Sequence, residues 1–253
     1  MKCPGQDRAY WRGERVFEVP CVKCGARVEF FRDEVSRRCS QCSTRLNNPR
    51  VALDCATWCD QAESCMGLSP SRIAAIGEAN VAVAGKLIEA LEEAIANEPD
   101  LVHRSLLVFQ HARELAPSAP VSPVIFLSAA LLVELKGFPL GGTGGSSAAG
   151  QREASGWATC RDILASAPFN EDTIAAITAL LEDFVKDRDN PRPEIQLLRD
   201  AVVLAQMSVS RSSDAVELEY NIRQALRTGA ARLWARTLFE SPGDNSSAPT
   251  TAS

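Results

Sequence analysis

The sequence predicts a mostly α-helical protein that begins with a small cysteine-rich module containing a β-hairpin. Two observations support this fold class. Eight of the nine cysteines lie between Cys3 and Cys65. Beyond them, apolar residues recur mostly three or four positions apart, which is typical of amphipathic helices. We therefore expect a cysteine-rich module over residues 1–67, a helical domain over 68–240 and a disordered tail over 241–253.

Composition limits the classes of function. The chain has 253 residues, of which 45% are hydrophobic, so it can bury a core. Its net charge of −5 divides into about +2 for residues 1–67 and −7 for the remainder. Such a balance does not favour a dominant phosphate-binding surface, and we expect no nucleic-acid partner.

We expect neither a secretion signal nor a membrane-spanning segment in this sequence. Its first residues, MKCPGQDRAYWRGER, contain no apolar core of a signal peptide. The longest apolar run, Val121–Leu135, is shorter than a membrane span and includes Ser128 and Glu134. A cytoplasmic location follows as an expectation, and in that compartment clustered cysteines more often bind metal than form disulfides.

The first cysteine group predicts a zinc site. Two CxxC motifs, Cys21/Cys24 and Cys39/Cys42, are separated by 14 residues, the spacing of a four-cysteine zinc ribbon over residues 14–45. Each motif presents two sulfurs from one tight turn, as a tetrahedral ion requires. Gly25 can relieve the first turn, and the β-prone segment Arg27–Phe31 fits a short hairpin. The metal is expected to supply much of the folding free energy of so small a module.

The second group consists of Cys3, Cys55, Cys59 and Cys65. Cys55 and Cys59 share one face if they lie on a helical turn, and Cys3 can complete a fourth position if the N-terminus folds back. The chain has no histidine before residue 103, so this site would be all sulfur. Four thiolates suit an iron–sulfur cluster, such as [4Fe–4S], or a second structural zinc ion. Cysteines that are merely packed are a further alternative.

Periodicity predicts a series of helices after Ser69-Pro70. We expect Asn170 to cap one of them. The predicted ranges are 72–97, 101–115, 121–136, 151–166, 171–187, 193–209 and 214–240. The glycine-rich segment 137–150 lacks the GxxxxGK[ST] pattern of a phosphate-binding loop and is predicted to be a flexible connection.

The N-terminal motifs MKCPGQD, FEVPCVKCG, VEFF, RRCSQC, NPR and DCATWC…ESC resemble bacterial HD-domain proteins that carry a zinc-ribbon-like segment. The helical part resembles their HD-domain phosphohydrolase body in helix order and hydrophobic patterning. The resemblance implies an HD-like helical bundle. It also implies an active site in which histidines and aspartates hold divalent ions that activate water for phosphoester hydrolysis.

Carried over residue by residue, that active site is largely missing. Arg104 stands where an early histidine is expected, Val133-Glu134 replaces the His-Asp pair, and Asp200 keeps the final acidic position. Arginine cannot ligate a metal, and valine has no donor atom. We therefore predict a degenerate HD pocket without catalytic residues, in which the remaining carboxylates form ion pairs with the arginine. The two histidines, His103 and His111, are expected to pack or lie at the surface, and Cys160 to be a small core residue.

The sequence thus favours a non-catalytic metal-binding protein, a pseudo-HD-domain adaptor, sensor or subunit that works in a complex with protein partners. One alternative is an iron–sulfur redox or electron-transfer protein that uses the second cysteine group. Another is a metal-dependent phosphohydrolase with displaced ligands.

Overall fold

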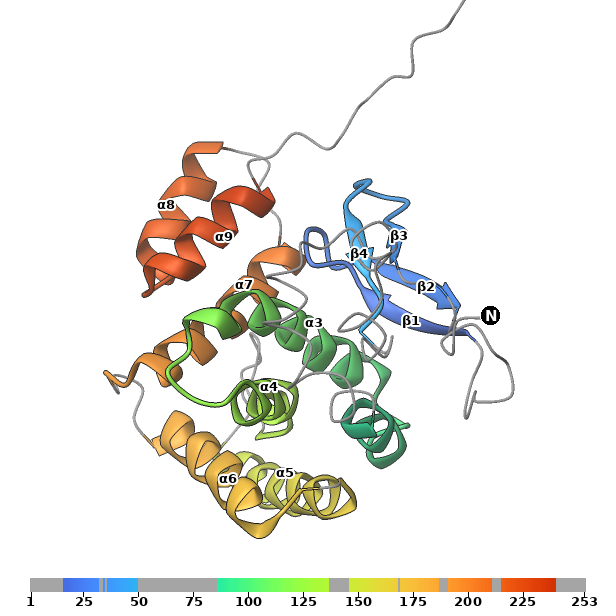
Figure 1. Ribbon diagram of the computed structural model, residues 1–253, viewed down its shortest axis with the longest axis vertical. Coiled ribbons are helices and arrows are strands. Elements are labelled where there is room, and N and C mark those ends of the chain that lie inside the picture. Colours follow the sequence, from blue (N-terminus) through green and yellow to red (C-terminus); the bar gives the residue numbers. More distant parts are fainter. Residues whose placement is uncertain are drawn as a thin grey trace, which may run out of the picture.

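The computed structural model describes residues 16–31, 34, 36–49, 86–136, 146–167, 169–186, 191–210 and 215–239. In these ranges a small β module is followed by a much larger helical part, which confirms the predicted mostly α fold class (Figure 1). The strands are β1 (Val16–Pro20), β2 (Arg27–Phe31), β3 (Ser36–Arg38) and β4 (Arg45–Asn47). The helices are α3 (Pro99–Leu115), η4 (Ala116–Ser118), α4 (Pro123–Leu132), η5 (Val133–Lys136), α5 (Ser146–Ser166), α6 (Glu171–Lys186), α7 (Pro193–Ser210), α8 (Ala215–Ala225) and α9 (Gly229–Phe239).

The β module consists of two antiparallel hairpins, β1–β2 and β3–β4. In the first hairpin Val16 lies opposite Phe31 and Pro20 opposite Arg27. Alternate residues of both strands point inward, and the rings of Phe17 and Phe30 stack with centroids 6.2 Å apart. The second hairpin adds the buried side chain of Leu46 to the same apolar cluster.

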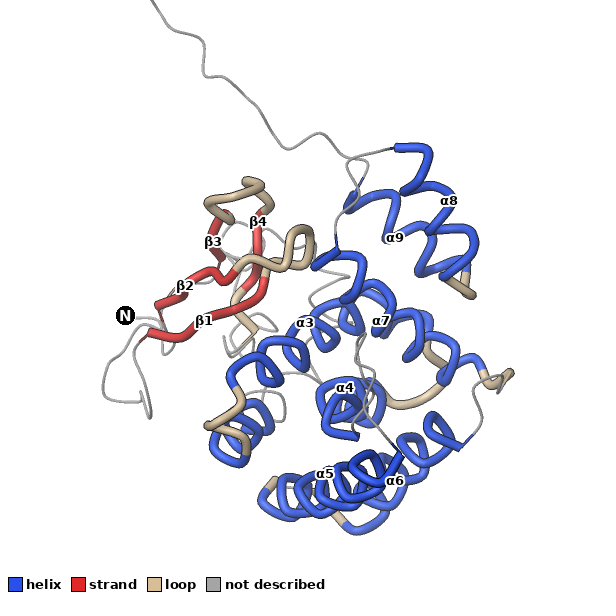
Figure 2. Tube along the Cα trace, turned by 180° about the vertical axis from the view of Figure 1, so that it is seen from behind, coloured by secondary structure: helices blue, strands red, loops and turns tan. Residues whose placement is uncertain are grey.

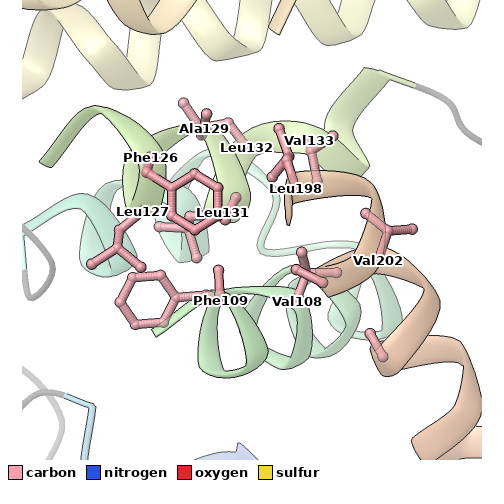
Figure 3. Close-up of a cluster of buried hydrophobic side chains, with 14 of the residues drawn as sticks. Val108, Phe109, Phe126, Leu127, Ala129, Leu131, Leu132, Val133, Leu198 and Val202 are labelled. Carbon is pink, nitrogen blue, oxygen red and sulfur yellow. The ribbon is translucent and has the colours of Figure 1, made fainter. Parts of the chain in front are cut away.

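A second, larger core holds the helices together. Helix α4 lies at its centre and packs against α3, α6 and α7 (Figure 1). Its side chains are buried on all sides from Phe126 to Leu132, as expected of a helix without a polar face. Figure 3 shows this cluster: Phe109 from α3, Phe126 from α4 and Leu198 from α7 belong to it.

The β module lies beside α3, and α5 and α6 lie on the other side of the helical part; both views agree on this placement (Figures 1 and 2). Strand β1 contacts α3 directly. Trp234 and Phe239 of α9 pack against both apolar clusters, and Leu238 is itself buried in the cluster of the β module. The helical part therefore completes the small core of the module.

Several predicted helices agree closely with the structure. Helices α3, α4 with η5, α6 and α7 begin and end within two residues of the predicted ranges. The amide of Thr173 donates to Oδ1 of Asn170 over 2.8 Å, which confirms the predicted cap of α6. Of the predicted helix 72–97, residues 86–97 are described: residues 86–94 are helical, and residues 95–97 form a turn.

The predicted flexible connection over 137–150 is wrong in its last part, because α5 begins at Ser146. Glycines at this position suggested a loop. A single glycine inside a helix costs only about 1 kcal/mol relative to alanine, and the serines and alanines around Gly150 tolerate the helix.

The prediction of one continuous helix over 214–240 is also wrong, because the structure divides it into α8 and α9. Asp200 of α7 causes the break. Its carboxylate accepts the backbone N–H groups of Arg227 and Thr228, each over 2.8 Å, and the Thr228 hydroxyl over 2.7 Å. The Thr228 oxygen in turn accepts the amide of Ala231 and so caps α9.

We predict that Asp200→Ala lowers the free energy of unfolding by about 3 kcal/mol, because it removes the acceptor of three hydrogen bonds at the start of α9. Urea unfolding measures this change. The control is Asp172→Ala, which removes an exposed carboxylate from α6. A change for Asp200→Ala no larger than for the control would show that Asp200 does not hold α9.

Candidate metal centre

The two CxxC motifs form turns of the same geometry, each at the tip of one hairpin. The amide of Cys21 donates to the Ala26 carbonyl, and that of Gly25 to the Cys21 carbonyl, both over 2.8 Å. The second turn repeats this pattern with Cys39 and Thr44, and with Ser43 and Cys39, both over 2.9 Å. The fourth residue after each first cysteine adopts a left-handed conformation, with φ of 66° at Gly25 and 58° at Ser43. Glycine adopts it without strain, as predicted for Gly25.

The turns bring the sulfurs of Cys21, Cys24, Cys39 and Cys42 within 4.8 Å of one another. The Sγ atoms of Cys21 and Cys42 are 3.5 Å apart, and those of Cys24 and Cys39 are 3.6 Å apart. A tetrahedral ion with metal–sulfur bonds of about 2.3 Å requires sulfurs about 3.8 Å apart. All four cysteines are free thiols rather than disulfides. The arrangement can therefore hold one metal ion.

The electrostatics of the thiols also suit a cation. Burial raises the pKa of Cys21, and it raises that of Cys24 to about 11. At Cys42 burial opposes ionisation, but hydrogen bonds with Thr44 and with neighbouring thiols outweigh it and lower the pKa to about 7. Several thiolates in so small a volume need a compensating positive charge, which a bound metal ion supplies.

Helix α3 attaches the first turn to the helical part through hydrogen bonds to backbone carbonyls. Nε2 of His103 donates to the Gly25 carbonyl over 2.9 Å. The buried amide of Gln110 donates to the Pro20 carbonyl over 2.8 Å. These bonds satisfy carbonyl groups that the short hairpin leaves unpaired, so they hold the metal-binding turn against α3.

A buried polar chain makes a third attachment. Nε1 of Trp234 can only donate, so Nδ1 of His111, 3.1 Å away, is the acceptor. The neutral ring of His111 then carries its proton on Nε2 and donates to Oγ of Ser208 over 3.0 Å. The Ser208 hydroxyl is left to donate to the carbonyl of Val22, which lies between the first two cysteines. This chain, Trp234–His111–Ser208–Val22, joins α9, α3 and α7 to the metal-binding turn.

The first turn also approaches α7 closely at Gly25. A Cβ atom at this position would lie 3.3 Å from Cγ2 of Val209 and 3.5 Å from the Ser208 carbonyl oxygen. Together with the positive φ, this contact explains why glycine occupies the position.

The residues that the sequence resemblance assigned to a degenerate HD pocket do not form a metal site in the part of the chain that the structure describes. Nε of Arg104 lies 3.4 Å from Oε2 of the buried Glu134, an ion pair of the kind the sequence suggested. Burial raises the pKa of Glu134, and Arg104 opposes that shift. Val133 is buried in the core, and Asp200 serves the start of α9. In the ranges that the structure describes, the four ribbon cysteines are the only group of three or more potential ligands close enough to share an ion.

The remaining candidates have other positions. Cys3, Cys55, Cys59 and Cys65 lie outside the described residues. Cys160 is buried in the helical core, as predicted. His103 and His111 are absent from the sulfur cluster, yet both help to attach the module, a role that sequence reasoning missed. The sequence did contain one signal for this role. The polar residues His103, Gln110 and His111 lie on sides of α3 where the hydrophobic periodicity predicts burial.

No family model, curated protein or solved structure matches this chain. Among the described helices, none is both long and apolar enough to cross a membrane. Function is therefore inferred from the geometry of the site.

The buried chain predicts a pH dependence of stability. Burial lowers the pKa of His111 from 6.5 to about 3. As the pH falls below 6.5, the unfolded chain binds a proton on this residue and the folded chain does not, so acid favours unfolding. Between pH 8 and pH 5.5 this residue should lower the free energy of unfolding by about 1.4 kcal/mol.

Urea unfolding of the metal-loaded protein across this pH range checks the prediction. His111→Gln removes the titrating group, so its stability should fall less with acid than that of the natural chain. Equal pH dependence in both proteins would contradict the assignment of a neutral, buried His111.

Proposed function

We propose that this chain is a non-catalytic zinc protein, in which a structural zinc ribbon is fixed to a helical domain and the whole acts as an adaptor or subunit of a larger protein complex. The closed four-sulfur cluster carries this proposal. Cys21 and Cys39 are buried, Cys24 and Cys42 half-buried, and no other ligand type lies among them.

Zinc is proposed because four thiolates in tetrahedral arrangement are typical of structural zinc sites. A catalytic zinc ion keeps one position for water or substrate, whereas here cysteine sulfurs supply all four positions. The ion would hold together the tips of the two hairpins, whose shared apolar cluster is small. A single iron ion can take the same four sulfurs, and elemental analysis distinguishes the two metals.

We propose no catalytic activity because the polar residues that could serve a catalytic site make structural contacts instead. Glu134 pairs with Arg104, Asp200 binds the backbone just before α9, and His103 and His111 bind the ribbon or its neighbours. Each of these four described residues thus already has a structural partner. Descent from an HD-domain hydrolase, as the sequence resemblance implies, stays a prediction, as does a redox role for the second cysteine group.

We predict that Cys39→Ser releases about one metal equivalent per chain, because the remaining three sulfurs bind the ion much more weakly. Mass spectrometry of the digested, desalted protein measures zinc and iron together. Cys160→Ser is the matched control, since it removes a buried thiol outside the cluster and should keep the full metal content. Equal metal content in the natural chain and Cys39→Ser, or iron in place of zinc, would contradict the proposed site.

We also predict no hydrolysis of nucleotides or of bis(p-nitrophenyl) phosphate above the buffer rate in the presence of Mn²⁺. The positive charge of Arg104 beside Glu134 repels a divalent metal ion. Release of phosphate and of nitrophenol is measured with the natural chain and with Glu134→Gln. Turnover that Glu134→Gln abolishes would show that the pocket is a working phosphohydrolase site.

A further inference from the structure

A groove runs along the junction between the zinc ribbon and the helical part. It has a volume of about 740 Å³ and lies between strands β1 and β2 on one side and residues 89–96 with α3 on the other. Apolar side chains contribute to its lining, among them Phe17, Val102 and Leu106. Val16, at its edge, is 39% exposed, although it sits at the end of a strand that is otherwise part of the module's core.

Acidic side chains predominate among the other residues that line the groove. Five glutamates line it: Glu18, Glu29, Glu89, Glu92 and Glu93. Glu29 and Glu93 are exposed and make no hydrogen bond or ion pair with any other described residue. Two carboxylates on opposite walls are thus available to a positively charged ligand.

Among the described residues that line the groove, the basic ones are Arg27 and His103, and neither pairs with Glu29 or Glu93. Arg27 already pairs with Glu18 and with Asp100, each over 2.9 Å. Burial, and after it the nearby Arg27, lowers the pKa of His103, so its ring is neutral near pH 7. The guanidinium group of Arg27 thus bridges Glu18 of the ribbon and Asp100 at the start of α3, so carboxylates from both parts of the chain can bind one cationic group.

An apolar lining with an acidic rim is complementary to one class of ligand. A basic amphipathic peptide can cover Val16 and Val102 with apolar side chains while its lysines or arginines face Glu29 and Glu93. Nucleic acids and acidic segments would be repelled. The groove also depends on the ribbon, since one of its walls belongs to the first hairpin.

We propose that this groove binds a lysine- or arginine-rich amphipathic segment of a protein partner. This inference rests on the proposed role as an adaptor or subunit, and it names the chemistry of the partner. The contact would join both parts of the chain, so the partner would recognise the ribbon only when it is attached to α3.

The full-length, zinc-loaded chain tests the proposal with three synthetic peptides of equal length, measured by calorimetry. A lysine–leucine amphipathic peptide should bind, a lysine–serine peptide of equal charge should bind at least about tenfold more weakly, and a glutamate–leucine peptide should not bind. Equal binding of both lysine peptides would show that charge alone accounts for binding, and it would overturn the proposal.

Charge-reversal variants locate the binding site. Glu29→Lys with Glu93→Lys should weaken binding of the lysine–leucine peptide about tenfold or more. Asp162→Lys with Glu171→Lys makes the same change of net charge at exposed positions of α5 and α6, on the far side of the helical part, and should have little effect. Val16→Ser should weaken binding without any change of charge. Equal effects of the two charge-reversal pairs would overturn the proposal.

Carbodiimide cross-linking, which joins carboxylates to amines, identifies the occupant. Cross-links from Glu29 or Glu93 to the peptide lysines are expected. Cross-links from the same glutamates to Lys2 of the chain, which persist when the peptide is added, would show that the chain fills its own groove and would overturn the external partner. Zinc content is measured on every variant, so a failure of the groove is distinguishable from a failure of the metal site.

Discussion

Four sulfur atoms in a partly buried volume are the constraint on which the rest of the structure depends. Their separations of 3.5 and 3.6 Å within pairs are those of ligands around one ion. Without a cation, burial disfavours ionisation of Cys21 and Cys24, and the hairpin tips have only a small apolar cluster to hold them together. The zinc ion that we propose would therefore contribute to folding rather than to chemistry.

The attachment of the ribbon links this constraint to the helical part. Asp200 fixes where α9 begins, and α9 carries Trp234 to His111 and Leu238 to the core of the ribbon. His111 and Ser208 then continue to the carbonyl of Val22, inside the first metal-binding turn. Asp200, which the sequence resemblance suggested as a hydrolase residue, thus supports the ribbon through a helix.

Local features were predictable from the sequence, whereas features that depend on tertiary contacts were not. The spacing of Cys21, Cys24, Cys39 and Cys42, the turn at Gly25 and the cap at Asn170 each depend on a few neighbouring residues. The break between α8 and α9 depends on Asp200, which is 27 positions from Arg227 in the chain. The roles of His103 and His111 depend on partners that are far away in sequence. Hydrophobic periodicity indicates which sides of α3 face the rest of the protein, but it does not identify these partners. The same reason explains why the acidic groove was not foreseen: its walls come from separate segments that meet only in the folded chain.

X-ray absorption at the zinc edge of the purified full-length protein tests the central claim most directly. The structure predicts a first shell of four sulfur atoms at about 2.3 Å, with no oxygen or nitrogen neighbour. A shell that contains nitrogen or oxygen, or a protein that carries no zinc at all, would contradict a closed four-cysteine zinc site at Cys21, Cys24, Cys39 and Cys42.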